Sequence, residues 1–285
     1  MSYKRALIRL LDRPGGRLLL GRIATSSLRR ISGPGVEIAY VDGLWTRRVG
    51  PHFFPDSSRF EYAYGDFDVW KRQMEVYEST TSDYWLRHYS PREGDVIVDV
   101  GAGHGEDTAA FSRGVGQKGR VIAIEAHPAT FAILKNFCRL NRLTNVTPLH
   151  LALAEQPGTV RIAESESSWM ENAIERSEVS SGTPVRAATF NDVYEEEGLT
   201  DIAFLKMNIE GAERLALPGM EPVIRHIRQI CVACHDFRSD HGDGEQFRTR
   251  SFVERFLTDH GFTLTSRPDD PREYVRDHIF GLRNR

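Results

Sequence analysis

Residues 95–113 place a buried strand, a glycine-rich turn and a helix start directly after one another, and no other stretch constrains the fold as strongly. Residues 96–100 are a short apolar, β-branched run, which predicts a strand buried on both faces. Gly101-Ala-Gly103-His-Gly105 follows, and residues 106–113 predict the first turns of a helix. Such a turn brings backbone N–H groups and the positive helix end against a ligand, because glycine lacks the Cβ that blocks close approach.

An acidic residue, Glu125, follows a second apolar run at residues 121–124. This spacing predicts a carboxylate at the tip of the neighbouring strand, where it accepts hydrogen bonds from ribose hydroxyls. Glu106 occupies the position at which a dinucleotide-binding turn carries its third glycine. A carboxylate there repels a pyrophosphate but tolerates an amino-acid zwitterion. The stretch therefore predicts a nucleoside-cofactor site and favours S-adenosylmethionine (SAM) over NAD.

Composition and charge exclude several classes of protein. The 285 residues carry a formal net charge of −3, so no nucleic-acid footprint extends over the whole chain and we expect no nucleic-acid partner. No apolar run reaches membrane-spanning length, and the apolar cluster at residues 18–20 is too short for a secretion signal. Three cysteines, an odd number, are typical of a reducing compartment. We therefore expect a cytoplasmic protein without stable membrane insertion.

The first 77 residues predict an extension that precedes the main domain. Apolar residues recur at helical spacing from Tyr3 to Leu11, and Pro14-Gly-Gly16 ends this helix. Residues 1–30 carry eight Lys or Arg and one Asp, a net charge of +7, so the other 255 residues sum to −10. Two interpretations of the basic face stay open. One is a surface for a membrane or an acidic partner, and the other, which we favour, is a solvated face on a helix packed against the domain or a second subunit.

Further segments complete this extension and lead into the main domain. Residues 36–50 alternate around Asp42-Gly43, which predicts a β-hairpin, and residues 51–58 predict a loop. Residues 60–89 are rich in Tyr, Trp and Phe and predict one or two helices. We expect most of these aromatic side chains in the core and a few at the mouth of a substrate pocket.

From residue 95 onward, predicted strands and helices alternate, which is typical of an α/β fold with a mostly parallel sheet covered on both faces. Polar residues 164–183 predict a mobile loop or a lid. Ligands bind beyond the carboxyl ends of such strands, and polar residues follow several of them, which favours an enzyme over a carrier. Helices are expected over residues 128–143, 190–197 and 247–260, and strands over residues 146–153, 158–163, 185–189, 201–207, 229–235, 262–266 and 274–282.

Three motifs resemble the FkbM family of class I SAM-dependent methyltransferases. They are Val-Ile-Val-Asp-Val-Gly-Ala-Gly-His-Gly at 96–105, Ile-Glu-Ala-His-Pro at 124–128 and, most specifically, Phe-Leu-Lys-Met-Asn-Ile-Glu-Gly-Ala-Glu at 204–213. The resemblance implies a Rossmann-like methyltransferase domain over residues 78–285, with a mostly parallel, seven-stranded sheet. It also implies O-methylation of hydroxyls on sugars, polyketides and other secondary metabolites, as in antibiotic biosynthesis.

The same resemblance implies roles for individual residues. Gly101 and Gly103 are expected to approach the methionine part of SAM, and Asp99 to orient the turn. Glu125 is expected to hold the ribose, while His127 and Ala152 flank the adenine. Glu78 matches a glutamate often seen in the family, although a solvated helix charge is an equal alternative. The full cofactor-binding set implied by the resemblance is Glu78, Asp99, Gly101, Ala102, Gly103, Glu125, Ala126, His127, Ala152 and Asn208.

Methyl transfer to a hydroxyl requires the acceptor oxygen to lie in line with the methyl group and to lose its proton. His235 ends a predicted core strand and titrates near neutral pH, so it is the first candidate for the base. A core histidine bonded to backbone is the alternative, and Glu210 and Asp236 are further candidates. Asn208 and Asp236 stand where related metal-dependent O-methyltransferases bind Mg²⁺, but the commonest family form has Asp at position 208, and Asn weakens such a site.

The sequence thus predicts a SAM-dependent O-methyltransferase for a small hydroxylated metabolite, such as a sugar or a sugar-bearing or polyketide natural product. Three alternatives stay open: an N- or C-methyltransferase of the same fold, a non-catalytic SAM-binding protein, and an NAD-dependent oxidoreductase, which Glu106 disfavours. The N-terminal extension is also compatible with a homo-oligomer contact.

Overall fold

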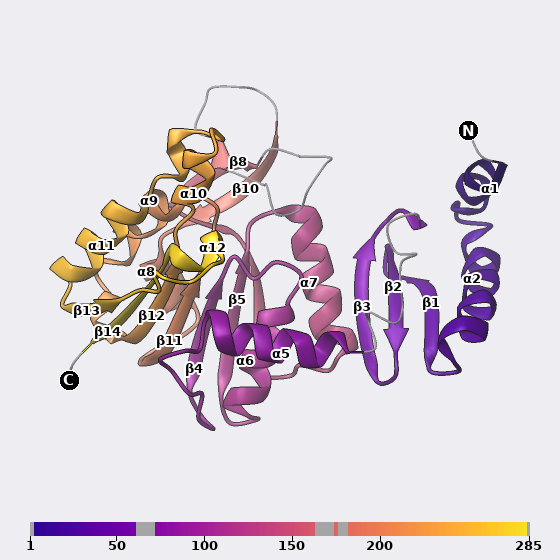
Figure 1. The fold of residues 1–285 in the computed structure, drawn as a ribbon, viewed down its shortest axis with the longest axis horizontal. Coiled ribbons are helices and arrows are strands. Elements are labelled where there is room, and N and C mark those ends of the chain that lie inside the picture. Colours follow the sequence, from indigo (N-terminus) through magenta and orange to yellow (C-terminus); the bar gives the residue numbers. More distant parts are fainter. Residues whose placement is uncertain (1–2, 61–71, 163–173, 176–181, 284–285) are drawn as a thin grey trace.

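A mostly parallel sheet of seven strands forms the centre of the protein. The computed structural model describes residues 3–60, 72–162, 174–175 and 182–283 (Figure 1). Within the sheet the strands lie in the order β13-β14-β12-β11-β4-β5-β6, and of these seven only β14 runs antiparallel to its neighbours. The predicted Rossmann-like α/β sheet is confirmed. The strands are β4 (Val96–Val100), β5 (Arg120–Glu125), β6 (Val146–His150), β11 (Ile202–Met207), β12 (Ile227–Ala233), β13 (Phe262–Thr265) and β14 (His278–Arg283).

Apolar side chains of these strands alternate between two layers, because successive residues of a strand point to opposite faces. Val98 and Ile122 belong to the layer covered by α8 (Phe190–Glu196), α9 (Glu213–Ala216) and α11 (Arg250–Asp259). Ile97 and Val121 belong to the layer under α6 (Glu106–Val115) and the end of α5 (Gln73–Tyr84). Helix α7 (Pro128–Leu140) covers the same face beside β5. Full burial of each such side chain stabilises the fold by about 1.5–3 kcal/mol.

The helices begin where the sequence supplies a cap. His127 precedes α7, its side chain accepts a hydrogen bond from the Thr130 N–H, and Pro128 occupies the first helical position, where its missing N–H costs nothing. At α8, Thr189 and Asp192 form a reciprocal capping box. These local signals explain why the predicted starts of both helices are confirmed.

Residues 146–162 depart from the prediction. The predicted strand over residues 146–153 breaks at the buried Leu151, where the chain leaves the large sheet after β6. Residues 158–162 do not extend that sheet. A second sheet, in the order β7-β10-β8-β9, takes both segments. It consists of β7 (Ala152–Leu153), β8 (Gly158–Ile162), β9 (Ile174–Glu175) and β10 (Thr183–Ala188). Most of the predicted lid over residues 164–183 lies outside the described residues.

Near the C-terminus the expected strand over residues 274–282 is shorter. Residues 273–276 form α12 (Glu273–Arg276), so β14 begins at His278. The described residues also form the short elements α10 (Asp236–Asp240), η2 (Pro218–Met220), η3 (Ile224–His226) and η4 (Glu245–Phe247), the last three of which are 3₁₀ turns.

The N-terminal unit is a three-stranded antiparallel sheet covered by helices. It comprises α1 (Tyr3–Leu11), α2 (Arg17–Ser32), β1 (Val36–Val41), β2 (Leu44–Val49) and β3 (His52–Ser57). The hairpin predicted at Asp42-Gly43 is confirmed by the pairing of Val41 with Leu44. The expected loop over residues 51–58 is wrong, because residues 52–57 pair with β2. Pro55 is tolerated there since β3 is an edge strand, which needs fewer N–H donors.

Helix α7 joins this unit to the large sheet. The side chain of Asn141 accepts a hydrogen bond from the Phe53 N–H at 3.0 Å and donates one to the Phe53 carbonyl at 2.7 Å. Phe54 packs near Phe137 of α7, with 6.4 Å between ring centroids. The expected domain boundary at residues 77–78 falls inside α5, and part of the aromatic segment, residues 61–71, lies outside the described residues. Within the described ranges no helix is both long enough and apolar enough to span a membrane.

We predict that Gly101→Ala destabilises the fold strongly. Gly101 has a φ of +73°, and a Cβ added there would lie 1.9 Å from the carbonyl oxygen of Asn208, which directly follows β11. The strained backbone and the clash together should lower the free energy of unfolding by more than about 3 kcal/mol in urea denaturation. Gly158→Ala is the matched control, because its Cβ would meet nothing within 4 Å. Equal stability of the two variants would contradict the prediction.

Candidate functional site

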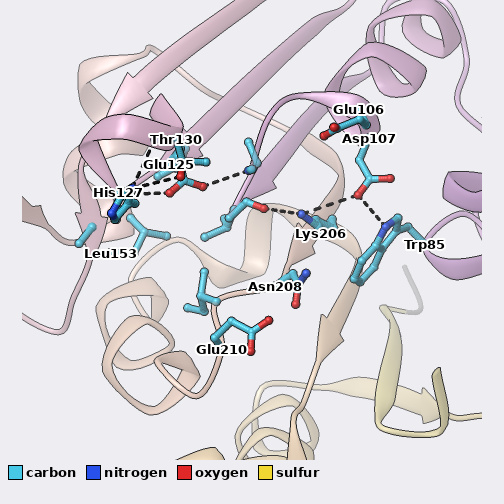
Figure 2. Close-up of a pocket in the computed structure, with 18 of the residues that line it drawn as sticks. Trp85, Glu106, Asp107, Glu125, His127, Thr130, Leu153, Lys206, Asn208 and Glu210 are labelled. Carbon is cyan, nitrogen blue, oxygen red and sulfur yellow. Dashed lines mark hydrogen bonds and ion pairs between the residues drawn. The ribbon is translucent and has the colours of Figure 1, made fainter. Parts of the chain in front are cut away.

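A cavity of about 500 Å³ opens at the carboxyl ends of β4, β5 and β11 (Figure 2). β4 lies between β5 and β11, and from it the chain builds the sheet first toward β6 and later toward β12, so the strand order reverses here. Open α/β sheets bind ligands at such reversal points. The volume falls within the range of about 300–1,000 Å³ that is typical of small-molecule sites.

The glycine turn lines the cavity, but at two of its positions neighbouring protein atoms, and not a ligand, exclude a Cβ. We expected the glycines to permit close approach of a ligand. At Gly101 the adjacent backbone of Asn208 already excludes a Cβ. At Gly105, whose φ is +101°, a Cβ would lie 2.9 Å from the side chains of Leu134 and Phe137 in α7. The shape of the turn therefore depends on its packing against α7 and the end of β11, and its other side lines the cavity.

A buried ion pair joins β4 to β11 beneath the turn. The Lys206 ammonium donates to Asp99 at 2.9 Å and to the Gly101 carbonyl oxygen at 2.7 Å. The Lys206 side chain is 2% exposed and that of Asp99 is fully buried. Burial alone would lower the pKa of Lys206, but attraction to Asp99 and Asp107 outweighs it and raises this pKa above its ordinary value. Lys206 was absent from the predicted site, although a lone lysine within an apolar strand was a usable signal.

The first turn of α6 and the end of α5 add further contacts to this lysine. Asp107 accepts hydrogen bonds from the Trp85 indole N–H at 2.9 Å and from the Thr81 hydroxyl at 2.5 Å, and it lies 4.0 Å from the Lys206 ammonium. The Trp85 ring lies 5.1 Å from the same ammonium. Figure 2 shows Trp85, Asp107 and Lys206 pointing toward one another. Burial raises the pKa of Asp107 to about 6. Tyr77, Tyr84 and Trp85 line the cavity, which agrees with the aromatic side chains expected at a pocket. Sequence reasoning missed the contacts of Trp85 and Asp107 with Lys206, because nothing local links these two residues to β11.

Glu125 is held rigidly at the cavity wall. One carboxylate oxygen accepts a hydrogen bond from the Gly103 N–H at 3.0 Å, and the other from the His127 N–H at 2.8 Å. Burial raises its pKa. The carboxylate thus ties the tip of β5 to the glycine turn, and it lines the cavity as the ribose prediction requires.

Glu210, and not His235, lies at the cavity wall. The Glu210 backbone has a φ of +53°, in the left-handed region. One carboxylate oxygen lies 3.2 Å from His235 Nε2 and the other accepts a hydrogen bond from Arg238 at 2.9 Å. Burial alone would raise the pKa of Glu210, but His235 and then Arg238 outweigh it and lower this pKa.

His235, our first candidate for the base, lies behind Glu210. Its side chain is 8% exposed and does not line the cavity. Burial alone would lower its pKa, but Glu210 and Glu213 raise it, which favours the protonated imidazolium. A buried, cation-like histidine does not reach a substrate directly. In the structure His235 therefore orients Glu210.

Asp236 is turned away from the cavity, so the expected pairing of Asn208 with Asp236 around Mg²⁺ is not formed. One Asp236 oxygen accepts hydrogen bonds from the Thr249 and Arg250 N–H groups, both at 3.0 Å, at the start of α11. Glu210 is already paired with two basic side chains. In the described part of the chain no three His, Cys, Asp or Glu side chains are grouped to hold a metal ion. The donor set does not fit Mg²⁺, and Asp236 does not fit a base.

The other predicted cofactor residues divide into two groups. Glu78 pairs with Arg113 on the surface, its side chain half exposed, and does not line the cavity, which agrees with the alternative of a solvated helix charge. Asn208 lines the cavity, and its buried Oδ1 has no hydrogen-bond partner in the described part of the chain. Its acceptor oxygen is therefore open to a donor from a ligand. The remaining members that line the cavity are Gly101, Ala102, Gly103, Ala126, His127 and Ala152.

Acidic groups predominate around the cavity. Glu106, Asp107, Glu125 and Glu210 line it, with Lys206 as the basic side chain among its lining residues. Burial raises the pKa of Glu106 to about 7, and Tyr77 is hydrogen-bonded to this carboxyl. The carboxylates that are ionised attract a cationic ligand and repel a pyrophosphate. This agrees with the preference for SAM over NAD.

Comparison with known proteins gives one match to a family model. Residues 99–264, more than half of the chain, match the methyltransferase FkbM domain. A curated protein, the tRNA (adenine(58)-N(1))-methyltransferase catalytic subunit TRM61 of Yarrowia lipolytica, is 31% identical over 78 residues. That match covers 27% of this chain and only 20% of the length of the relative.

Solved structures resemble the fold more distantly. A putative O-methyltransferase from Klebsiella pneumoniae has 13% identity and a TM-score of 0.46, with 78% of this chain and 92% of that chain covered. The O-methyltransferase TomG from Streptomyces achromogenes has 9% identity and a TM-score of 0.46, with 75% and 81% covered. Aeropyrum pernix fibrillarin has 14% identity and a TM-score of 0.44, with 87% and 83% covered.

We predict that Lys206→Met lowers the free energy of unfolding by about 3–5 kcal/mol, because it leaves Asp99 buried without its cation. Urea denaturation measures this loss. Lys118→Met is the matched control: the Lys118 side chain is 81% exposed and lies 3.8 Å from Glu93, so its loss should cost at most about 1 kcal/mol. Adding Asp99→Asn to Lys206→Met should recover part of the stability. A Lys206→Met protein as stable as the control would show that the pair does not hold the strands together.

Proposed function

The chain belongs to the FkbM family of SAM-dependent methyltransferases, and we propose that it transfers the methyl group to a hydroxyl of a small metabolite, such as a sugar or polyketide. The observation that carries the proposal is Glu210, a carboxylate at the cavity wall that two basic side chains hold in place. The acceptor must lose a proton, and Glu210 is the side chain positioned to take it.

The cavity fits SAM on its own chemistry. The acidic wall suits the positive charges of the sulfonium and the amino group, and Asn208 Oδ1 offers an unused acceptor to a donor. Glu125, fixed by two backbone N–H groups, is placed to accept hydrogen bonds from ribose hydroxyls. The turn from Gly101 to Gly103 would hold the methionine part. When bound, SAM supplies a methyl group on a positively charged sulfur.

The chain's own residues then handle the acceptor. Glu210 is ionised at neutral pH, because His235 and Arg238 lower its pKa, so it accepts a hydrogen bond from a hydroxyl and orients the oxygen. As the oxygen loses electron density to its new bond, its proton becomes acidic and passes to the carboxylate. Trp85 and Tyr84 line the cavity with aromatic surface.

Transfer to nitrogen is the second candidate. The curated relative TRM61 is named as an N-methyltransferase of a tRNA adenine, which favours this possibility. A ring nitrogen with a free lone pair needs no strong base, so Glu210 would then be dispensable. Against a polynucleotide acceptor stands the net charge of −10 over residues 31–285, which opposes a phosphate backbone.

We predict that the protein binds S-adenosylhomocysteine but not NAD in a calorimetric titration. Glu125→Ala should weaken that binding about 10- to 100-fold, because it removes a charged hydrogen-bond acceptor. Glu155→Ala, an exposed glutamate, serves as the control and should bind as the wild type does. Preference for NAD, or full affinity in Glu125→Ala, would refute the proposed cofactor arrangement.

We predict that Glu210→Gln slows methyl transfer to hydroxyl acceptors by about 10²–10⁴-fold, with the affinity for S-adenosylhomocysteine unchanged. The measurement uses SAM with a labelled methyl group and a panel of sugar, polyketide and nucleoside acceptors, with Glu155→Gln as the control. Retention of the full rate by Glu210→Gln, on whichever acceptor the wild type methylates, would favour transfer to nitrogen.

A further inference from the structure

Exposed apolar side chains gather on the two N-terminal helices. In the described ranges nine large apolar side chains are strongly exposed, and six of these lie in α1 and α2. Single exposed apolar residues are ordinary, whereas a concentration of them marks a surface that binds something. The six are Leu7, Leu10, Leu18, Leu19, Ile23 and Ile31.

In both helices the apolar surface extends beyond the side that packs on the N-terminal unit. In α1, Ile8 and Leu11 pack against the core of the N-terminal unit, while Leu7 and Leu10 are 54% and 59% exposed. In α2, residues 20, 24 and 28 are buried, while Leu19 and Ile23, one turn apart, are each 53% exposed. An apolar stripe on a helix is normally covered by the protein core or by a partner. The exposed part of the apolar surface of α1 and α2 therefore needs a partner.

Basic side chains accompany the apolar ones. Arg9, Arg13, Arg22 and Arg30 are exposed and form no ion pair with any other described residue. Arg30 follows Ile23 by seven positions, so in helical geometry Leu19, Ile23 and Arg30 share one stripe. Residues 1–30 carry a net charge of +7 in a chain whose other residues sum to −10. The partner must therefore offer negative charge and apolar contact together.

We propose that α1 and α2 form a binding surface for an anionic lipid bilayer. The helices lie at the end of the molecule that is farthest from the seven-stranded sheet (Figure 1), so a flat surface can reach them without covering the cavity. The arginines pair with anionic headgroups, and the leucine and isoleucine side chains enter the boundary between headgroups and acyl chains. This attachment is peripheral and independent of the proposed methyl transfer.

Two other partners fit the surface less well. A second copy in a two-fold dimer would place the same basic helices against each other, because such an interface uses one patch on both subunits. A nucleic acid would satisfy the arginines but leave the leucine and isoleucine side chains in water, because its affinity comes mainly from phosphates. Only the bilayer matches both kinds of side chain.

The experiment is co-sedimentation of the full chain with phosphatidylcholine vesicles, with and without phosphatidylglycerol. The wild type should bind only the anionic vesicles, and added salt should weaken binding. Leu19→Ser with Ile23→Ser should weaken it at least about tenfold. Arg22→Gln and Arg30→Gln should each weaken it about fivefold. Thermal unfolding checks that the variants stay folded.

Matched variants elsewhere on the surface provide the controls. Leu282→Ser replaces a leucine that is 46% exposed in β14, and Arg255→Gln removes an exposed arginine of α11; both should bind vesicles as the wild type does. Equal binding to neutral vesicles, no binding to either kind, or full binding by the double serine variant would overturn the proposal. Sedimentation of the protein alone tests whether a second copy covers the surface. If the wild type is a dimer that does not bind vesicles, and Leu19→Ser with Ile23→Ser makes it a monomer, the surface belongs to a second copy.

Discussion

The ion pair between Lys206 and Asp99 is the interaction on which the site depends. It crosses from β4 to β11 where the strand order reverses, and the same ammonium binds the Gly101 carbonyl oxygen. Through Asp107 it also reaches Trp85 and so helix α5. An isolated buried charge would be very costly, so each of these groups requires the others. One lysine thereby fixes two strands, the glycine turn and the helix that closes the cavity.

The pairing of buried charges also determines which carboxylates of the site are ionised. A site with several carboxylates can stay folded because some are paired, as Asp99 is with Lys206, and others hold their protons more readily, as Glu106 and Asp107 do with pKa values of about 7 and about 6. Glu210 differs, since His235 and Arg238 keep it ionised. The cavity therefore has carboxylates that suit a cationic cofactor and one carboxylate, Glu210, that suits the acceptance of a proton. The neighbouring groups of each carboxylate cause this difference in pKa.

Helix α7 links the two parts of the molecule. Its first turn borders the cavity through His127 and Thr130, and Asn141, just beyond its last turn, binds the backbone of β3. The N-terminal unit is consequently fixed relative to the cavity by packing and hydrogen bonds. If α1 and α2 rest on a bilayer, as proposed, β3 and α7 connect that surface to the cavity.

The sequence by itself determined the fold class, the strand–turn–helix unit, Glu125 at its strand tip and the first hairpin, because each follows from periodicity, glycine placement or caps within a short window. The family resemblance also identified eight of the residues that line the cavity. Only the tertiary structure decided that Glu210 faces the cavity with His235 behind it, that Asp236 caps α11, and that Lys206 joins two strands. It likewise decided that residues 52–57 form a strand and that the strand beginning at Val146 breaks. The physical reason is the same throughout: residue type and spacing fix which element forms, whereas the direction of a side chain at a strand end depends on charges and backbone that other elements bring to it.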